Sequence, residues 1–129
     1  AGGLGAGLVA FCGATLKPGI DLVLRVTGFE DRLATADLVI TGEGKIDEQV
    51  KFGKALAGVI NASRLRRVPV LAAVGAVEGR HEAFVNDDFL AGLESLTNET
   101  TSSEEAMNNA SALLTERTRL LLQRYFNRT

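Results

Sequence analysis

The sequence predicts an α/β protein built on a parallel β-sheet. Two continuous aliphatic runs, at residues 36–41 and 68–74, have the length and composition of strands buried on both faces, and a glycine follows each run. The stretch between them, from Gly53 to about Arg64, is rich in small and aliphatic residues and favours a helix packed closely on a sheet. A strand, a helix and a second strand in this order predict that the two strands are parallel.

Two helices are expected before the first strand. Apolar residues at i, i+4, i+7 and i+8 predict one helical face, formed by Leu4, Leu8, Phe11 and Cys12. Pro18-Gly19 ends this helix. Residues 20–27 fit both an alternating strand and a helical face, and we favour the helix. Within the first helix, Cys12 is expected to be a small buried hydrophobic residue.

Three elements are expected after the second strand. Residues 80–84 favour a weak helix, and residues 93–96 a short third strand. Ser102 and Glu105 form a capping-box pattern, which marks the start of a helix. The helix is expected to be long and to present one apolar face, made of Met107, Ala110, Leu114 and Leu121.

The composition argues against several classes of function. The formal net charge of the 129 residues is −2, which argues against nucleic-acid binding through charge. A single cysteine allows no internal disulfide, and one cysteine with one histidine argues against a zinc site. No apolar run approaches the about 20 residues of a membrane span, and there is no signal peptide, so we expect a cytoplasmic protein. Because the chain opens with Ala1 and a glycine-rich stretch, we expect its N-terminal side to be truncated.

The stretch from Thr41 to Lys54 is the candidate site. It begins where the first strand is expected to end, and ligands of open parallel sheets bind beyond the carboxyl ends of the strands. Gly42 and Gly44 would let the backbone approach a ligand, and Gly75 follows the second strand. Charged and amide side chains lie close together at Glu43, Lys45, Asp47, Gln49 and Lys54. Such a set suits a metal–phosphate complex, because carboxylates bind Mg²⁺ or take a proton and lysines neutralise phosphate oxygens.

Other interpretations stay open at this point. The motif could be a surface turn with solvated charges. It does not match a Walker loop, which would need a glycine at position 48, or the dinucleotide pattern, which would need one at position 47. The glycine-rich opening, with Gly3 and Gly5, leads into a helix whose amides could cradle a phosphate; equally, these glycines could serve only close helix packing.

Taken together, these residues resemble the C-terminal part of bacterial glycerate kinases. The likeness covers essentially the whole chain and rests on residues 1–7, on Thr41-Gly42-Glu43-Gly44-Lys45-Ile46-Asp47-x-Gln49, and on Gly53-Lys54 and Gly58-Val59. It implies a flavodoxin-like, or Rossmann-like, segment of a two-domain α/β fold, with residues 1–129 forming one piece of a longer enzyme. Four positions depart from the family pattern. Lys45 stands where Arg is usual, Val50 where a hydroxyl residue is usual, and Leu56 where Pro is usual. Ala76 stands where Ser is common, which puts a hydroxyl contact from the loop after Gly75 in doubt.

The resemblance also implies an activity and a set of roles. Such enzymes use ATP and Mg²⁺ to phosphorylate D-glycerate to a phosphoglycerate. Asp47 would be the general base or a Mg²⁺ ligand, Glu43 a second acid, and Gln49 a group that orients the substrate. Lys45 and Lys54 would hold phosphate or the substrate carboxylate, and nucleotide or substrate would also contact Gly3, Gly5, Gly42, Gly44 and Gly75. The alternative is a non-catalytic α/β module that binds a small anion. A homo-oligomer is possible, and the fragment alone is expected to be inactive.

Overall fold

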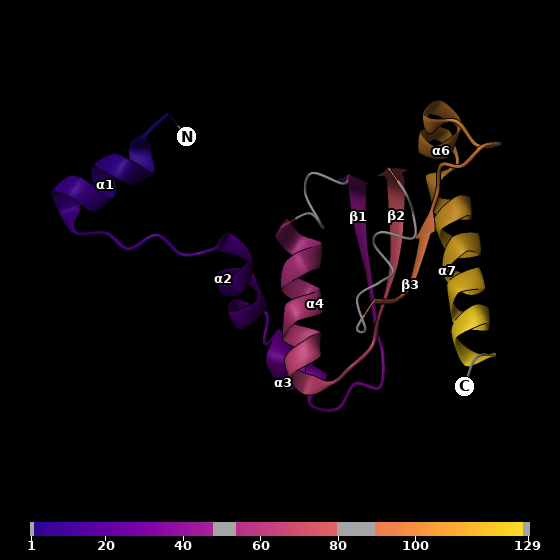
Figure 1. Ribbon diagram of the computed structural model, residues 1–129, viewed down its shortest axis with the longest axis horizontal. Coiled ribbons are helices and arrows are strands. Elements are labelled where there is room, and N and C mark those ends of the chain that lie inside the picture. The colour runs from indigo at the N-terminus through magenta and orange to yellow at the C-terminus, as the bar shows by residue number, and fades with distance from the viewer. Residues whose placement is uncertain (1, 48–53, 80–89, 128–129) are drawn as a thin grey trace.

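A parallel three-stranded sheet lies at the centre of the computed structural model, which describes residues 2–47, 54–79 and 90–127. The strands are β1 (Val39–Asp47), β2 (Val70–Glu78) and β3 (Leu90–Ser95), in the order β1-β2-β3. Both neighbouring pairs are parallel, and α4 (Lys54–Arg66) lies between β1 and β2 in the chain (Figure 1). The predicted parallel strand–helix–strand unit is therefore confirmed.

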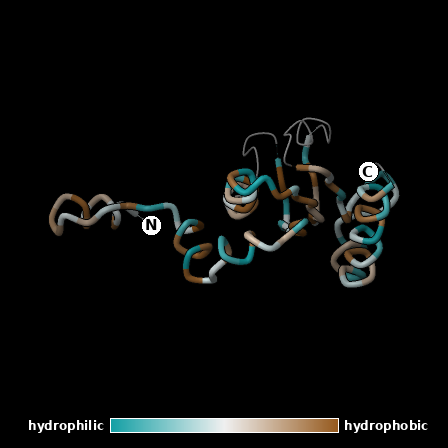
Figure 2. The backbone as a smooth tube through the Cα atoms, turned by 90° about the horizontal axis from the view of Figure 1, so that it is seen from below, coloured by the Kyte–Doolittle hydropathy of each residue, from teal (hydrophilic) through white to brown (hydrophobic). Residues whose placement is uncertain are grey.

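Helices cover both faces of this sheet. Figures 1 and 2 show α4 on one side and α7 (Ala110–Phe126) on the other. Alternate residues of β2 are buried against the two helices: Val70, Ala72 and Val74 on the side of Leu56 and Ile60, and Leu71 and Ala73 on the side of Leu121. Burying a Leu, Ile or Val side chain fully stabilises the fold by about 1.5–3 kcal/mol relative to leaving it exposed. Because β2 has buried residues on both faces, it is the centre of the core.

The strands end later than predicted. β1 begins at Val39 and continues through two glycines to Asp47, and β2 begins at Val70 and passes through Gly75. The expectation that a glycine ends each strand is wrong, because these glycines allow the two backbones to come close together. A Cβ on Gly42 would lie 2.9 Å from the carbonyl oxygen of Ala73, and one on Gly75 would collide with the carbonyl oxygen of Gly44. β3 was predicted as a short strand and is confirmed, although it begins three residues earlier.

β1 and β2 differ in burial. The first five residues of β2 are buried, as predicted for a strand covered on both faces. β1 alternates between half-buried and exposed residues, and Ile40 is 48% exposed. The prediction of burial on both faces is wrong for β1, because α4 covers one face, whereas α7 packs chiefly on β3 and β2 and leaves Ile40 exposed on the other.

Three helices precede the sheet: α1 (Leu4–Cys12), α2 (Gly19–Val26) and α3 (Phe29–Leu33). The first two were predicted and are confirmed. α2 packs on α4 through Ile20, which occupies the space that a side chain on Gly58 would need. α1 lies apart from the sheet in Figures 1 and 2, and none of its residues is buried. Cys12 is consequently exposed, so its predicted burial is wrong.

The capped helix after β3 is confirmed at its start. Ser102 is the N-cap of α6 (Ser103–Asn108), and its Oγ accepts a hydrogen bond of 3.2 Å from the backbone N–H of Glu105. The prediction of one long helix is wrong, because the backbone leaves helical geometry at Asn109 and a second helix, α7, begins after it. Met107, on the other side of this break, is exposed; within α7, Leu121 is buried and Leu114 is 47% exposed, so the predicted single apolar face is buried only in part.

The predicted helix at 80–84 lies outside the described residues. Among the described helices, none combines the length and the apolar character that crossing a membrane requires.

Candidate functional site

Charged side chains lie at the carboxyl ends of the parallel strands. The β1–β2 register pairs Lys45 with Ala76 and Asp47 with Glu78. The first part of the motif, residues 41–47, was predicted as a loop but belongs to β1 itself, and strand pairing holds it in place. The carboxyl ends of parallel strands are where ligands of open α/β sheets bind, so the predicted position of the site agrees with this architecture.

Two paired glycines change the direction of the side chains just before these charges. Along β2, both Val74 and Val77 pack on the core cluster of α4, although they are three residues apart and would point to opposite faces of a regular strand. Val39 and Ile46 of β1, seven residues apart, show the same interruption. The interruption on both strands spans Gly44 and Gly75, where the backbones come closest. After this interruption of the alternation, Lys45 is exposed and the next residue, Ile46, is buried.

An ion pair joins β1 and β2 at this edge. Lys45 Nζ lies 2.6 Å from Glu78 Oε1, and the two side chains are 53% and 63% exposed. The hydrogen bond with Glu78 raises the pKa of Lys45 above its ordinary value of 10.5; desolvation of the ammonium group opposes this rise, and the charges of Glu78 and Asp47 add to it. Lys45 therefore remains a cation at neutral pH and can bind a phosphate or carboxylate group.

The two acids of the motif are half-buried on β1. Glu43 Oε1 accepts a hydrogen bond of 3.2 Å from the backbone N–H of Gly44, so this carboxylate lies along its own strand. Asp47 is the last residue of β1, and its charge acts on Lys45. The structure therefore groups three of the predicted site residues, Glu43, Lys45 and Asp47, on one strand end.

The structure explains the glycines at this edge in different ways. Gly42 and Gly75 are required by the close approach of β1 and β2. Gly44 is exposed, and a Cβ built there would meet no atom within 4 Å. Because strand packing does not require a glycine at Gly44, this position leaves the most room for a ligand to approach the backbone.

Gly3 and Gly5, which were also predicted, are not brought to this edge (Figure 1). Gly3 is the left-handed N-cap of α1, and a Cβ on Gly5 would make only an ordinary contact of 3.4 Å with the side chain of Leu16, so packing does not require glycine there. α1 lies apart from the sheet in Figure 1. Gln49 falls outside the described residues, and Lys54 is described only as the first residue of α4.

Three polar residues at the same edge were not predicted. Glu78 ends β2, Ser95 ends β3, and Thr97 follows. The Ser95 hydroxyl and the Thr97 N–H donate hydrogen bonds of 3.4 and 3.1 Å to the carbonyl oxygen of Gly75. The signal available in the sequence was a polar residue at the end of each aliphatic run, and the weight given to the glycine after each strand obscured it.

The site fits Mg²⁺ only as part of a larger ligand set. The part of the chain that is described contains no cluster of three or more His, Cys, Asp or Glu side chains able to hold a metal. Mg²⁺ bound to a nucleotide needs one or two carboxylates, with phosphate oxygens and waters completing the octahedron. Asp47 fits the role of one such carboxylate.

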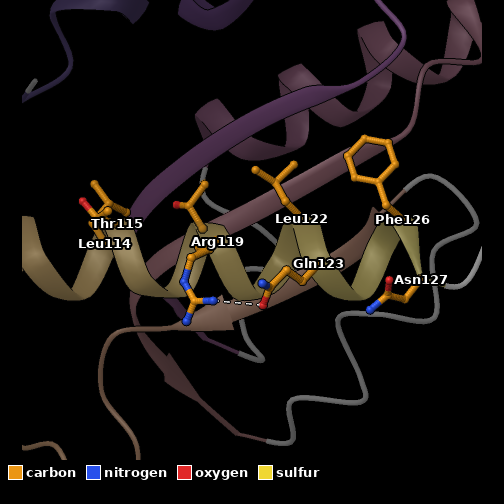
Figure 3. A pocket seen from close by; sticks show the side chains of 8 residues that line it. Leu114, Thr115, Arg119, Leu122, Gln123, Phe126 and Asn127 are labelled. Atoms are coloured by element: carbon orange, nitrogen blue, oxygen red, sulfur yellow. Dashed lines mark hydrogen bonds between the residues drawn. The ribbon is translucent and has the colours of Figure 1, made fainter.

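A separate hollow runs along α7, and Figure 3 shows its lining side chains. Arg119 donates a hydrogen bond of 3.1 Å to Gln123 there. The lining residues all come from this one helix or its end and include no carboxylate: Leu114, Thr115, Thr118, Arg119, Leu122, Gln123, Phe126 and Asn127. The hollow therefore lacks the acidic groups that phosphoryl transfer requires.

A parallel sheet covered by helices on both faces, with acids and a lysine at the carboxyl end of its edge strand, defines an α/β protein with a charged sheet edge. The sequence profile of the glycerate kinase family matches residues 1–125, so the chain belongs to the glycerate kinase family. The family and the α/β class predicted from the sequence are both confirmed.

Relatives of known name support this membership. Glycerate kinase of Halalkalibacterium halodurans is 44% identical over 119 residues, which make up 92% of this chain and 31% of the relative. Glycerate 2-kinase of Escherichia coli K12 is 44% identical over 77 residues, 60% of this chain and 20% of the relative. A crystal structure of a Salmonella typhimurium LT2 protein described as a glycerate kinase 2 superimposes with a TM-score of 0.67 at 32% identity, covering 99% of this chain and 32% of that one.

The chain thus spans about a third of the length of these relatives. Coverage gives the length of the shared region and not its place in the longer chains. The expectation that residues 1–129 form a C-terminal piece of a larger enzyme stays a prediction.

Proposed function

We propose that this chain acts in the ATP-dependent phosphorylation of D-glycerate, as part of a polypeptide of the length found in its relatives. One observation carries the proposal: in a member of the glycerate kinase family, strand pairing holds Glu43, Lys45 and Asp47 at the carboxyl end of a parallel sheet. Phosphoryl transfer depends on positioning and on charge neutralisation more than on covalent catalysis, and this set of groups supplies both.

Each residue has a role in this proposal. Lys45, a cation at neutral pH, binds a phosphate oxygen or the glycerate carboxylate, with Lys54 as a second cation. Asp47 accepts the proton of the glycerate hydroxyl or holds Mg²⁺, which would neutralise charge on the transferred phosphoryl group. Glu43 is the second acid, and Gln49 orients the substrate. The open backbone at Gly44 admits the ligand. Gly42 and Gly75 keep β1 and β2 close enough to present these groups.

The name of one relative, glycerate 2-kinase, supports the 2-hydroxyl as the acceptor. Separating 2-phosphoglycerate from 3-phosphoglycerate in the product mixture tests this choice.

Replacing Asp47 with Asn in a protein of family length tests the proposal most directly. The change keeps shape and hydrogen bonding but removes the charge. We expect kcat to fall by a factor on the order of 10² or more, because a general base or metal-positioning group acts on the transition state. Stability should hardly change, since a half-exposed carboxylate at a strand end contributes little to folding. Steady-state kinetics with glycerate and ATP, together with thermal unfolding, give both quantities.

Asp37→Asn is the matched control, because Asp37 is exposed and precedes β1 at the opposite end of the strand. It should keep the wild-type kcat. If Asp47→Asn also keeps it, the motif is a surface feature without a catalytic role. If the unmodified protein binds glycerate or phosphate but turns over no ATP, the anion-binding module is the correct function.

A further inference from the structure

The N-terminal part of the chain exposes a large apolar surface. We call residues 4–26, which comprise α1, α2 and the segment between them, the apolar arm. Figure 2 shows brown and pale tones along α1, away from the sheet. The large hydrophobic residues exposed on the arm are Leu4, Leu8, Val9, Phe11, Leu16, Leu22, Val23 and Val26, with exposures reaching 90% at Phe11 and 77% at Val26.

This surface is unfavourable in water. α1 carries no charged residue in its nine positions, and none of them is buried. A helix that is apolar on all sides is normally buried, and an isolated helix of this length is marginal in water. α2 contacts α4 through Ile20 and leaves Leu22, Val23 and Val26 exposed. A single exposed apolar residue such as Met107 is ordinary, whereas eight within 23 consecutive residues are not.

We propose that the apolar arm is an intrachain docking surface, covered by the part of a family-length polypeptide that lies outside the region matched here. A polypeptide of family length contains enough further chain to cover the arm. The matched region makes up 31% of the Halalkalibacterium halodurans relative, so about two thirds of such a chain lies elsewhere. The composition of α1 indicates the chemistry of the covering surface. Because α1 has no charged group, the surface that covers it should be apolar. The proposal rests on family membership and does not depend on the catalytic role of Asp47.

Hydrogen exchange of the unmodified protein at family length tests this without any substitution. If the arm is covered, backbone amides of residues 8–12 should exchange more than about 100-fold more slowly than an unstructured peptide. Exchange within about tenfold of the unstructured rate would show that α1 is exposed and frayed, and would overturn the proposal.

A matched pair of variants tests the cover chemically. Phe11→Asp places a charge on the arm, whereas Met107→Asp places one on α6, where the original side chain is 74% exposed in the described structure. We expect Phe11→Asp to lower the Tm by about 5 °C or more and Met107→Asp to change it by less than about 2 °C, because only the first would lose a buried side chain. If Phe11→Asp does not fold, Phe11→Ala should show the same direction with a smaller shift. Equal effects of the two charged variants would refute the proposal.

Two outcomes would assign the arm to another occupant. Protection that disappears on dilution, together with a change from dimer to monomer, would show that a second copy covers it. Protection that requires phosphatidylcholine vesicles would show that lipid does. Either outcome overturns the intrachain proposal, while the activity test of Asp47 is unaffected by both.

Discussion

At the scale of single residues, the pair formed by Lys45 and Glu78 is open to direct measurement. Glu78 raises the pKa of Lys45, so Glu78→Gln should lower that pKa toward 10.5. A raised lysine pKa stabilises the folded protein below the unfolded pKa, and this contribution is lost as pH rises through the folded pKa, so stability should change with pH through this pair only in alkaline solution. NMR titration of the lysine side-chain carbons would measure the shift.

Glu94→Gln is the control for this titration. Glu94 also lies on a strand of the sheet, but its carboxylate pairs with Arg124 of α7. Removing the Glu94 carboxylate should leave the pKa of Lys45 unchanged. An unchanged pKa in Glu78→Gln would show that the ion pair does not form in solution.

The paired glycines give a second prediction at this scale. A methyl group on Gly75 would lie 3.3 Å from the carbonyl carbon of Gly44 and closer still to its oxygen, whereas one on Gly44 meets no atom within 4 Å. Gly75→Ala should therefore destabilise the protein by about 1–3 kcal/mol, the cost typical of overpacking. Gly44→Ala should change stability by less than about 0.5 kcal/mol. Chemical denaturation of both variants separates them, and equal losses would mean that β1 and β2 are farther apart than described.

At the scale of elements, the packing of α2 on α4 depends on one glycine. A Cβ on Gly58 would lie 3.2 Å from the Cβ of Ile20 and would collide with its Cγ1. Gly58→Ala should destabilise the protein by about 1–3 kcal/mol, even though alanine favours a helix by about 1 kcal/mol over glycine.

A double-mutant cycle identifies the cause. In an Ile20→Ala background the collision is removed, so adding Gly58→Ala should be neutral or stabilising. Thermal unfolding of the four proteins gives the interaction energy. Additive effects would mean that the α2–α4 contact is not the reason for the glycine.

At the scale of the whole molecule, the described segment is a three-layer core with two unfinished surfaces. β2 is buried on both faces, while β1 is the edge of the described sheet and the apolar arm lies apart from it. At the charged edge, β1 presents one lysine and two acids, and β2 adds Glu78; in the proposed function these groups form part of a site for two anionic substrates. Both surfaces are consistent with a segment that covers about a third of its relatives.

The sequence by itself determined the elements whose signals are local. The helical spacing of Leu4 and Leu8, the break at Pro18-Gly19 and the cap at Ser102 all act within a few residues, and α1, α2 and α6 begin where these signals lie. The aliphatic runs predicted three strands and the parallel pairing of the first two. The family motif indicated Glu43, Lys45 and Asp47 as one group, and β1 holds them together.

Tertiary structure alone decided the features that depend on what lies opposite a residue. β1 and β2 extend past their glycines because neighbouring backbones approach closely there, and no local pattern records that distance. Cys12 is exposed because nothing described packs against α1, although its spacing resembles that of a buried face. Glu78 became the partner of Lys45 through strand register, across 33 positions of the chain. Periodicity and capping act over one or two turns, whereas burial and ion pairing depend on chain segments brought together by folding.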